Sequence, residues 1–337
     1  MPDMKLNSVK CLAAATAVLI ALCVQIACPT TAASQAVVTT PQIPAGKDND
    51  LKFYAANGNI LKGRDALEQM PRADLSLWLA GNQFFAMDDV VAGFQKLNAG
   101  KSVAVITLPP GLLLQAIKAG GWIFEGKEFP GLPDVYASVN LGHLKQLKSS
   151  GLMDSYMIYM HNELQIMVAK GNPKKITGID DLVRSDIRTS MPNPVNEGIM
   201  QFYGRKVLER HGLWQQISAG KECVSCETTK NNWFTAVHHR ETPDRIKAGQ
   251  SDAGLVWKTE VLEALRDGAE VEAVALPAED SLRNEVSYVI GALGKAAHRQ
   301  TAEAYLSFLR LPEGQDAYAK FGFVKADDEE LKMKPIN

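Results

Sequence analysis

The stretch LSLWLAGNQFFAMDDVVAGF, residues 75–94, sets the pattern that most of the chain follows. Its first residues, LSLWLA, are apolar apart from one serine and are typical of a buried strand. Asn82 is positioned to cap a helix, and apolar residues from Phe84 to Phe94 then recur at helical spacing. A buried strand followed at once by an amphipathic helix is the repeating unit of an α/β fold.

The same alternation of strands and helices continues on the C-terminal side of this stretch. Thr242 and Pro243 are expected to be the N-cap and the first residue of one of these helices. The alternation predicts a mostly parallel central sheet flanked by helices. The other segments that predict strands are KSVAVITL (101–108), PDVYASVN (133–140), NELQIMVAKGNP (162–173), DIRTSM (186–191), NWFTAV (232–237), SDAGLVW (251–257), VEAVAL (271–276) and VSYVIGAL (286–293).

Length and composition limit the possible classes of protein. With roughly 150 residues per domain as a guide, 337 residues predict about two lobes, and 46% hydrophobic residues supply a core for each. The 36 basic residues nearly cancel the 38 acidic ones, which leaves a net charge of -2. A chain with so little net charge has no global basic field to hold a polyanion, so nucleic-acid binding is disfavoured.

The N-terminus has the pattern of an export signal. Lys5 and Lys10 precede an uncharged apolar run at 11–27, and small residues follow this run. We interpret residues 1–33 as a signal peptide, which places the mature protein in the periplasm. Residues 34–72 are rich in Thr, Pro, Gly, Asn and Asp, and we expect them to form a leader arm on the surface.

The cysteines support an exported protein. A lipid anchor at Cys28 is disfavoured because Gln25 stands where a lipoprotein signal usually has leucine. Removal of the signal leaves only Cys223 and Cys226, and an oxidising compartment favours a disulfide between them. A redox-active thiol pair and a zinc site shared with the two histidines that follow are the alternatives.

Candidate binding residues gather in the loops where predicted strands end and helices begin. In α/β sheets, ligands bind at the carboxyl ends of the strands, where helix N-termini favour anions. Helix capping is the structural alternative for the asparagines in these loops. The predicted ligand-binding residues are Asn82, Gln83, Gly111, Asn140, Asn193, Glu197, His238, Arg240, Glu241 and Trp257.

The sequence HHRE, residues 238–241, is the densest polar cluster. Alternation at a strand end would turn His238 and Arg240 one way and His239 and Glu241 the other. Arg240 could bind an oxyanion with two donors. A metal site formed by Glu197 with one of these histidines and Glu241 is the alternative.

The sequence lacks four motifs that would indicate an enzyme. A nucleophile elbow, a P-loop, a dinucleotide-binding glycine motif and an HExxH motif are all missing from the sequence. We therefore expect no catalytic residues, no cofactor and no enzymatic activity. A thiol or metal enzyme built around the cysteines and histidines is the remaining alternative from another class.

Five strings, in this order, resemble the periplasmic substrate-binding proteins of ABC importers, specifically the type II group that includes molybdate and tungstate binders. The resemblance covers about residues 74–325. It depends on LSLWLAGN, PDVYASVN, NELQIMVAKGNPKKITGIDDL, GQSDAGLVWKTEV and FLRLPEGQDAYAKFGF.

This resemblance implies a two-lobed type II fold with two crossover hinge strands, and a small anion bound between the lobes. It implies that residues 73–162 with 278–337 form lobe 1 and that residues 163–277 form lobe 2. The implied partner is an ABC permease in the inner membrane. The resemblance also implies that the binding protein itself is a monomer. By position, Asn82 and the turn formed by Pro109, Pro110 and Gly111 stand at the two serines that hold the oxyanion in the family's molybdate binders, and Trp257 stands at a tyrosine.

Overall fold

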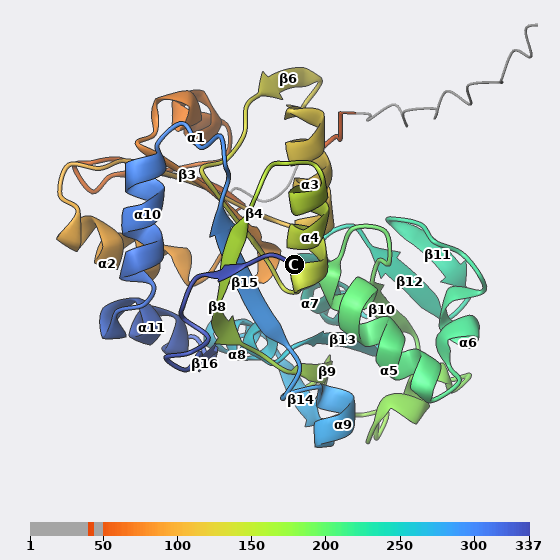
Figure 1. The fold of residues 1–337 in the computed structure, drawn as a ribbon. Helices are drawn as coiled ribbons and strands as arrows, with labels where there is room; N and C mark the ends of the chain where they lie inside the picture. Colours follow the sequence, from red (N-terminus) through yellow and green to blue (C-terminus); the bar gives the residue numbers. More distant parts are fainter. Residues whose placement is uncertain (1–39, 44–49) are drawn as a thin grey trace, which may run out of the picture. The chain divides into compact units, whose positions relative to one another are not determined.

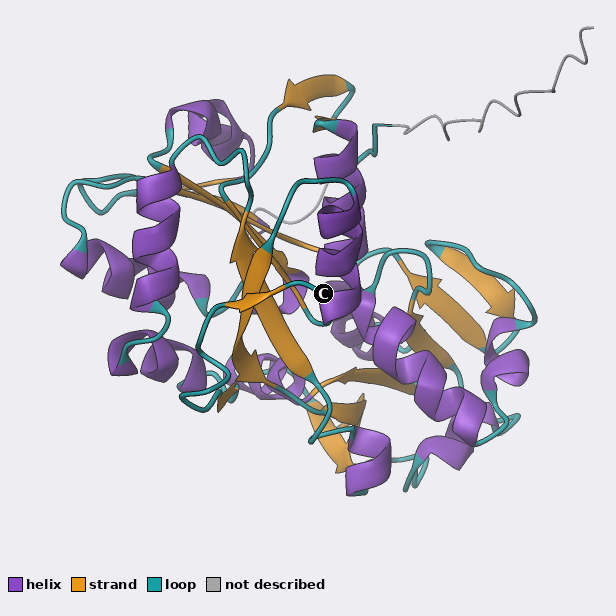
Figure 2. Ribbon diagram, in the orientation of Figure 1, coloured by secondary structure: helices purple, strands orange, loops and turns teal. Residues whose placement is uncertain are grey.

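The computed structural model describes residues 40–43 and 50–337, which form two large mixed sheets flanked by helices (Figures 1 and 2). The predicted signal peptide, residues 1–33, and Cys28 lie outside the described residues. No helix among the described residues is long and apolar enough to cross a membrane.

The first sheet has nine strands in the order β16-β8-β15-β7-β3-β4-β1-β2, with β17 also paired to β8. Strand β3 is the predicted segment LSLWLA, and it runs parallel to β4 and β7. The strands are β1 (Leu51–Tyr54), β2 (Ile60–Lys62), β3 (Leu75–Ala80), β4 (Val103–Leu108), β7 (Val135–Ser138), β8 (Ser155–His161), β15 (Ser287–Ala292), β16 (Val324–Lys325) and β17 (Lys334–Pro335).

The second sheet has six strands in the order β11-β12-β10-β13-β9-β14, and a separate hairpin joins β5 to β6. Strand β10 runs parallel to β12 and β13. The strands are β9 (Leu164–Ala169), β10 (Thr189–Pro192), β11 (Cys226–Thr229), β12 (Asn232–Thr235), β13 (Ala253–Trp257) and β14 (Val271–Ala275), and the hairpin is β5 (Gly121–Phe124) with β6 (Lys127–Pro130).

The prediction of mostly parallel sheets is wrong outside the central strands, because both sheets are mixed. Strand β15 pairs antiparallel with β7 and β8, and β9 pairs antiparallel with β13 and β14. The reason lies in the chain's path. Only Asn162 and Glu163 separate β8 in the first sheet from β9 in the second, and the chain returns to the first sheet between β14 and β15. The strands β9 and β15, which follow these crossings between the sheets, are antiparallel to their neighbours.

Helices cover both faces of the first sheet because alternate residues of β3 point to opposite sides. Leu77 and Leu79 join the core cluster that contains Phe94 of α2 and Phe308 of α10, whereas Trp78 joins the cluster formed with α3 and α4. The helices are α1 (Gly63–Gln69), α2 (Met87–Leu97), α3 (Pro110–Ala119), α4 (Leu141–Ser149), α5 (Arg205–Arg210), α6 (Trp214–Ser218), α7 (His238–Lys247), α8 (Lys258–Arg266), α9 (Ala278–Ser281), α10 (Arg299–Phe308) and α11 (Pro312–Ala319).

The segment predicted to be a leader arm forms regular structure from residue 51 onward. Strand β1 is fully buried and pairs antiparallel with β4, with Leu51 opposite Ile106. Helix α1 follows β2 and packs against both strands. The prediction of a surface arm is therefore wrong for residues 51–72. The apolar side chains of LKFY are buried because this segment pairs with β4, which lies more than forty residues away in the sequence.

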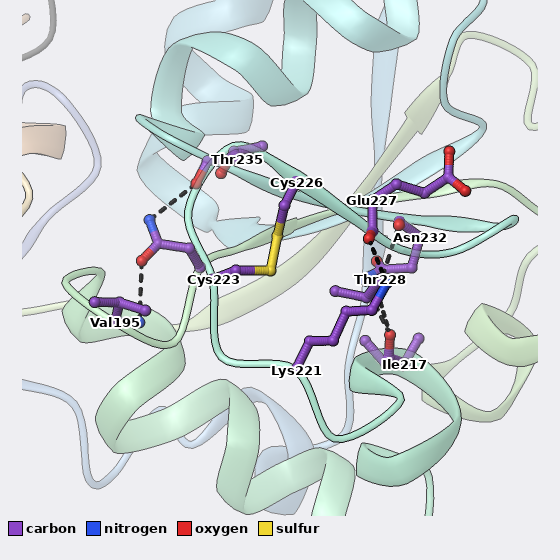
Figure 3. The surroundings of a disulfide bond; sticks show 10 residues. Val195, Ile217, Lys221, Cys223, Cys226, Glu227, Thr228, Asn232 and Thr235 are labelled. Atoms are coloured by element: carbon purple, nitrogen blue, oxygen red, sulfur yellow. Dashed lines mark hydrogen bonds between the residues drawn. A yellow bond between two sulfur atoms is a disulfide. The ribbon is translucent and has the colours of Figure 1, made fainter.

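Cys223 and Cys226 are joined by a disulfide where a loop enters β11 (Figure 3). The loop is also tied by the ammonium of Lys221, which donates to the Glu227 carbonyl at 3.0 Å. Both sulfur-bearing side chains are half-buried against the main core cluster. The disulfide closes a very short loop, so it restrains the chain only locally.

Candidate functional site

The loops that follow parallel strands of the two sheets contact each other through their backbones. The N–H of Gly111, at the start of α3, donates to the Asn196 carbonyl at 3.0 Å. A Cβ atom at Gly111 would lie 2.8 Å from both Cα and O of Asn196. This approach requires glycine at position 111, and it joins the loop after β4 to the loop after β10.

Asn82 lies in a buried group of uncharged polar side chains. Its amide donates to the Tyr288 hydroxyl at 2.7 Å and to the Thr259 hydroxyl at 3.4 Å. The amide of Asn162, at the passage between the sheets, donates to the same Thr259 hydroxyl at 2.9 Å. The expectation that Asn82 caps a helix is wrong. A short 3₁₀ helix, Gly81–Gln83, intervenes and α2 begins at Met87, so the Asn82 amide reaches α8 and β15 instead.

Helix α7 begins at His238, which overturns the expectation that Thr242 caps it and that Pro243 is its first residue. Pro243 lies inside the helix. The Glu241 carboxylate accepts hydrogen bonds from the backbone N–H groups of Ala236 and Val237, at 2.7 and 2.9 Å. This cap stabilises an earlier start, and the HHRE residues are helical and do not alternate on a strand.

His238 is enclosed by two carboxylates. Its Nδ1 lies 2.9 Å from Glu197 Oε2 and its Nε2 lies 3.0 Å from Glu260 Oε1, and all three side chains are at most 4% exposed. Burial disfavours the charged imidazole. The charges and hydrogen bonds of the two glutamates outweigh burial and raise the pKa of His238 to about 10. His238 is therefore a buried cation at neutral pH.

Arg240 and His239 form a second group with Asp50 and Phe84. Arg240 pairs with the Asp50 carboxylate, and its guanidinium lies 5.4 Å from the centre of the Phe84 ring. The His239 ring stacks on Phe84, with its Nε2 3.6 Å from Asp50 Oδ1. His239 and Arg240 thus contact the same partners, contrary to the expectation that they face opposite ways. The difference arises because both residues lie in helix α7, and side chains alternate to opposite sides only on a strand.

Gln83 and Asn193 are held by neighbours of their own. The Gln83 side-chain carbonyl accepts from the hydroxyls of Tyr159 and Tyr318, both at 2.8 Å. The Asn193 amide donates to the Thr235 carbonyl at 2.9 Å, and its side-chain oxygen accepts two N–H groups of the loop that it begins. These bonds fix the loops in place.

Asn140 and Trp257 lie where α4 and β13 meet the aromatic residues between the sheets. Asn140 caps α4, as capping predicts, by accepting from the Gly142 N–H at 2.9 Å, and its amide donates to the Tyr203 hydroxyl at 3.1 Å. Trp257 is buried, and its ring centre lies 5.7 Å from that of Tyr203 and 5.9 Å from that of Tyr288.

A second buried histidine, His143 of α4, links two segments that are distant in sequence. Its Nδ1 lies 2.8 Å from the Ser138 hydroxyl and 3.3 Å from the Tyr136 hydroxyl. Its Nε2 lies 3.0 Å from the side-chain oxygen of Gln201, in the π-helix Met200–Gly204. Burial lowers the pKa of His143 to about 4, so this imidazole is neutral at pH 7.

The predicted metal alternative gains no support from these positions. Glu197 and His238 are in contact, but the Glu241 carboxylate caps α7 and does not join them. Across residues 40–43 and 50–337, no three or more His, Cys, Asp or Glu side chains are grouped so that they could hold a metal ion.

Sequence reasoning missed Glu260 and Asp50. Glu260 had a readable signal, because it lies three residues after the end of a strand and its carboxylate accepts the Trp257 N–H at 3.1 Å, as in a capping box. Asp50 had none, because its partner Arg240 lies 190 residues away. Local sequence patterns cannot predict such a pair.

A model of the bacterial extracellular solute-binding protein family matches residues 75–324. A sulfate-binding protein of Synechococcus elongatus is 27% identical over 201 residues, which cover 56% of this chain and 57% of that protein. The chain thus spans under two thirds of the length of the first curated relatives that it matches.

Two solved structures have a similar fold. The periplasmic molybdate-binding protein of Azotobacter vinelandii superposes with a TM-score of 0.59 and 17% identity, covering 75% of this chain and 100% of that one. The sulfate-binding protein SubI of Mycobacterium tuberculosis superposes with a TM-score of 0.56 and 19% identity, covering 76% of this chain and 88% of that one. The α/β fold is that of these binding proteins.

Proposed function

This chain belongs to the bacterial extracellular solute-binding protein family, and we propose on that basis that it is the substrate-binding component of an ABC importer. It captures a small anion, an oxyanion or an anionic metabolite, and delivers it to a permease in the inner membrane. The chain is a solute-binding protein, like its relatives, and not an enzyme.

The observation that carries the anion proposal is the set of hydrogen-bond donors at the start of α7, whose two cations are paired with carboxylates of the chain itself. His238 is a buried cation, Arg240 lies two residues further along, and the first turn of α7 adds the positive end of its helix dipole. The relatives named for sulfate and molybdate bind oxyanions, which such donors suit. Near-neutral net charge is compatible with this, because a few local hydrogen-bond donors suffice to hold a small anion.

Capture would use the loops that already contact one another. We propose that residues 73–162 with 278–337 form one lobe and that residues 163–277 form the other. A ligand that touches loops of both lobes favours their closed arrangement, and it shifts the population toward that state. The backbone contact between Gly111 and Asn196 supports this use of the two loops.

The location and partners of the mature protein are part of the same proposal. Its family is extracellular, and removal of residues 1–33 would release a monomer into the periplasm without a lipid anchor at Cys28. The disulfide between Cys223 and Cys226 suits that oxidising compartment.

A ligand screen of the mature protein tests the proposal. Thermal shift and calorimetry would compare sulfate, molybdate, phosphate and small carboxylates with divalent metal ions. A ligand at about a hundred times its Kd stabilises the native state by about 2.7 kcal/mol, which is readily measured. Saturable binding of at least one anion is expected. Stabilisation by a metal ion alone, abolished by a chelator, would overturn the proposal in favour of a metal binder.

A further inference from the structure

The carboxylate of Glu197 occupies the start of α7 as a bound anion would. Its Oε1 accepts the backbone N–H of His238, the first residue of the helix, at 3.0 Å. Its Oε2 lies 2.9 Å from His238 Nδ1. A helix N-terminus and a histidine cation are donors suited to an anionic ligand, and here both face a carboxylate of the chain itself.

This carboxylate comes from a different part of the fold. Glu197 lies in the loop after β10, 41 residues before His238, so it is not a cap within the helix. Glu241 already performs that local role by accepting the N–H groups of Ala236 and Val237. Local helix capping therefore does not account for the position of Glu197.

The charges at this site are compensated within the protein. The His238 cation faces Glu197 and Glu260, and Arg240 faces Asp50. An anion that simply joined this group would enter next to two buried carboxylates. Two negative charges in contact repel each other strongly in a buried environment. One carboxylate must therefore leave before an anion can bind.

Glu197 is the carboxylate best placed to leave. Glu260 is anchored by its own helix, because its Oε2 accepts the Trp257 N–H. The two oxygens of Glu197 face only His238 among the polar contacts described above. The backbone of Glu197 is held, since its carbonyl accepts the N–H groups of Met200 and Gln201, both at 3.0 Å. The proposed departure therefore moves the side chain and leaves the backbone in place.

We propose that Glu197 is a built-in competitor that sets the affinity and specificity of the site. An anionic solute displaces the Glu197 carboxylate from His238 and takes over its two donors. The site therefore selects anions whose oxygens can accept from the His238 N–H and the imidazolium together, as a carboxylate or tetrahedral oxyanion can. This inference rests on the proposed function.

Calorimetry of the full mature chain with sulfate and with molybdate tests the competitor. Glu197→Gln keeps the shape of the side chain and removes its charge, so it competes more weakly for the imidazolium. We expect it to bind the anion about tenfold to a hundredfold more tightly than the wild type. The matched control is Glu303→Gln, which removes the same charge from an exposed side chain of α10 that pairs with Arg299 and is no part of the proposed site. Its affinity should change by less than about threefold.

The outcomes separate the two proposals. Tighter binding by Glu197→Gln alone supports the competitor, even if the wild type binds too weakly to measure. Equal or weaker binding by Glu197→Gln, or equal gains in both variants, overturns it while the anion proposal stands. No binding of any anion by the wild type or either variant overturns both. If Glu197→Gln does not fold, Glu197→Asp, whose shorter side chain holds His238 less closely, is expected to show the same gain and is judged by the same criteria.

Discussion

The buried imidazole of His143 should make the protein sensitive to acid. Its folded pKa is about 4, whereas the ordinary value, which applies to the unfolded chain, is 6.5. Between these values the unfolded chain binds a proton that the folded chain excludes, so the free energy of unfolding falls as pH falls. The full difference corresponds to about 3 kcal/mol, and one proton gives a slope of up to about 1.4 kcal/mol per pH unit.

Glutamine at position 143 has no such titration. His143→Gln keeps a neutral polar side chain that can reach Ser138 or Gln201, although some packing is lost. The free energy lost with this packing is independent of pH. The comparison therefore depends only on how steeply the free energy of unfolding changes with pH in each protein. Urea denaturation of both proteins from about pH 4 to 7 would give the free energy of unfolding at each pH. We expect the wild type to lose about 3 kcal/mol more than the variant across this range.

Carboxylates with lowered pKa values also titrate in acid, but they are common to both proteins and cancel in the difference. Parallel pH profiles for the wild type and His143→Gln would refute the reasoning. A direct check is the ring-proton resonance of His143 in the NMR spectrum. It should keep the shift of the neutral imidazole down to about pH 5, and titration near the ordinary value would contradict the assigned environment.

Three further predictions concern other contacts. Gly111→Ala places a Cβ against the Asn196 backbone, so calorimetry should show anion affinity reduced about tenfold or more, and unchanged affinity would mean that this contact is not used in binding. Arg240→Ala leaves the Asp50 carboxylate buried without its guanidinium, and urea denaturation should show a loss of about 3 kcal/mol, whereas a neutral effect would contradict the buried pair. Reduction of the disulfide should cost no more than about 2 kcal/mol, because the closed loop is short, and global unfolding on reduction would be inconsistent with this.

Local sequence patterns predict the interior strands well. LSLWLA is strand β3 at the predicted residues, and the predicted segment SDAGLVW contains strand β13, Ala253–Trp257. Apart from Ser76 in β3, both strands are apolar and lie in the middle of their sheets, so their burial does not depend on one particular partner. Asn140 as the cap of α4 is equally local, because donor and acceptor are two residues apart.

The errors share a physical origin in long-range contacts. The segment LKFY forms a strand because it pairs with β4, and local sequence does not reveal this pairing. The early start of α7 depends on how the Glu241 carboxylate folds back onto preceding N–H groups. The candidate site was predicted as a set of loop ends, and His238 with Glu197 was among them. The pairing of the cations at this site with carboxylates was not predicted, because the paired residues come from segments that no local sequence pattern connects.

The contact between Gly111 and Asn196 has a consequence for engineering the protein. The bond uses the backbone N–H of one residue and the backbone carbonyl of the other, so it does not depend on the side chain at position 196. The Asn196 side-chain oxygen is buried and has no hydrogen-bond partner among the described residues. Because the residue is buried and its own N–H donates to Asn193, a library of small uncharged side chains other than proline at position 196 keeps the link between the two loops. Such a library would be a starting point for biosensors that respond to new solutes.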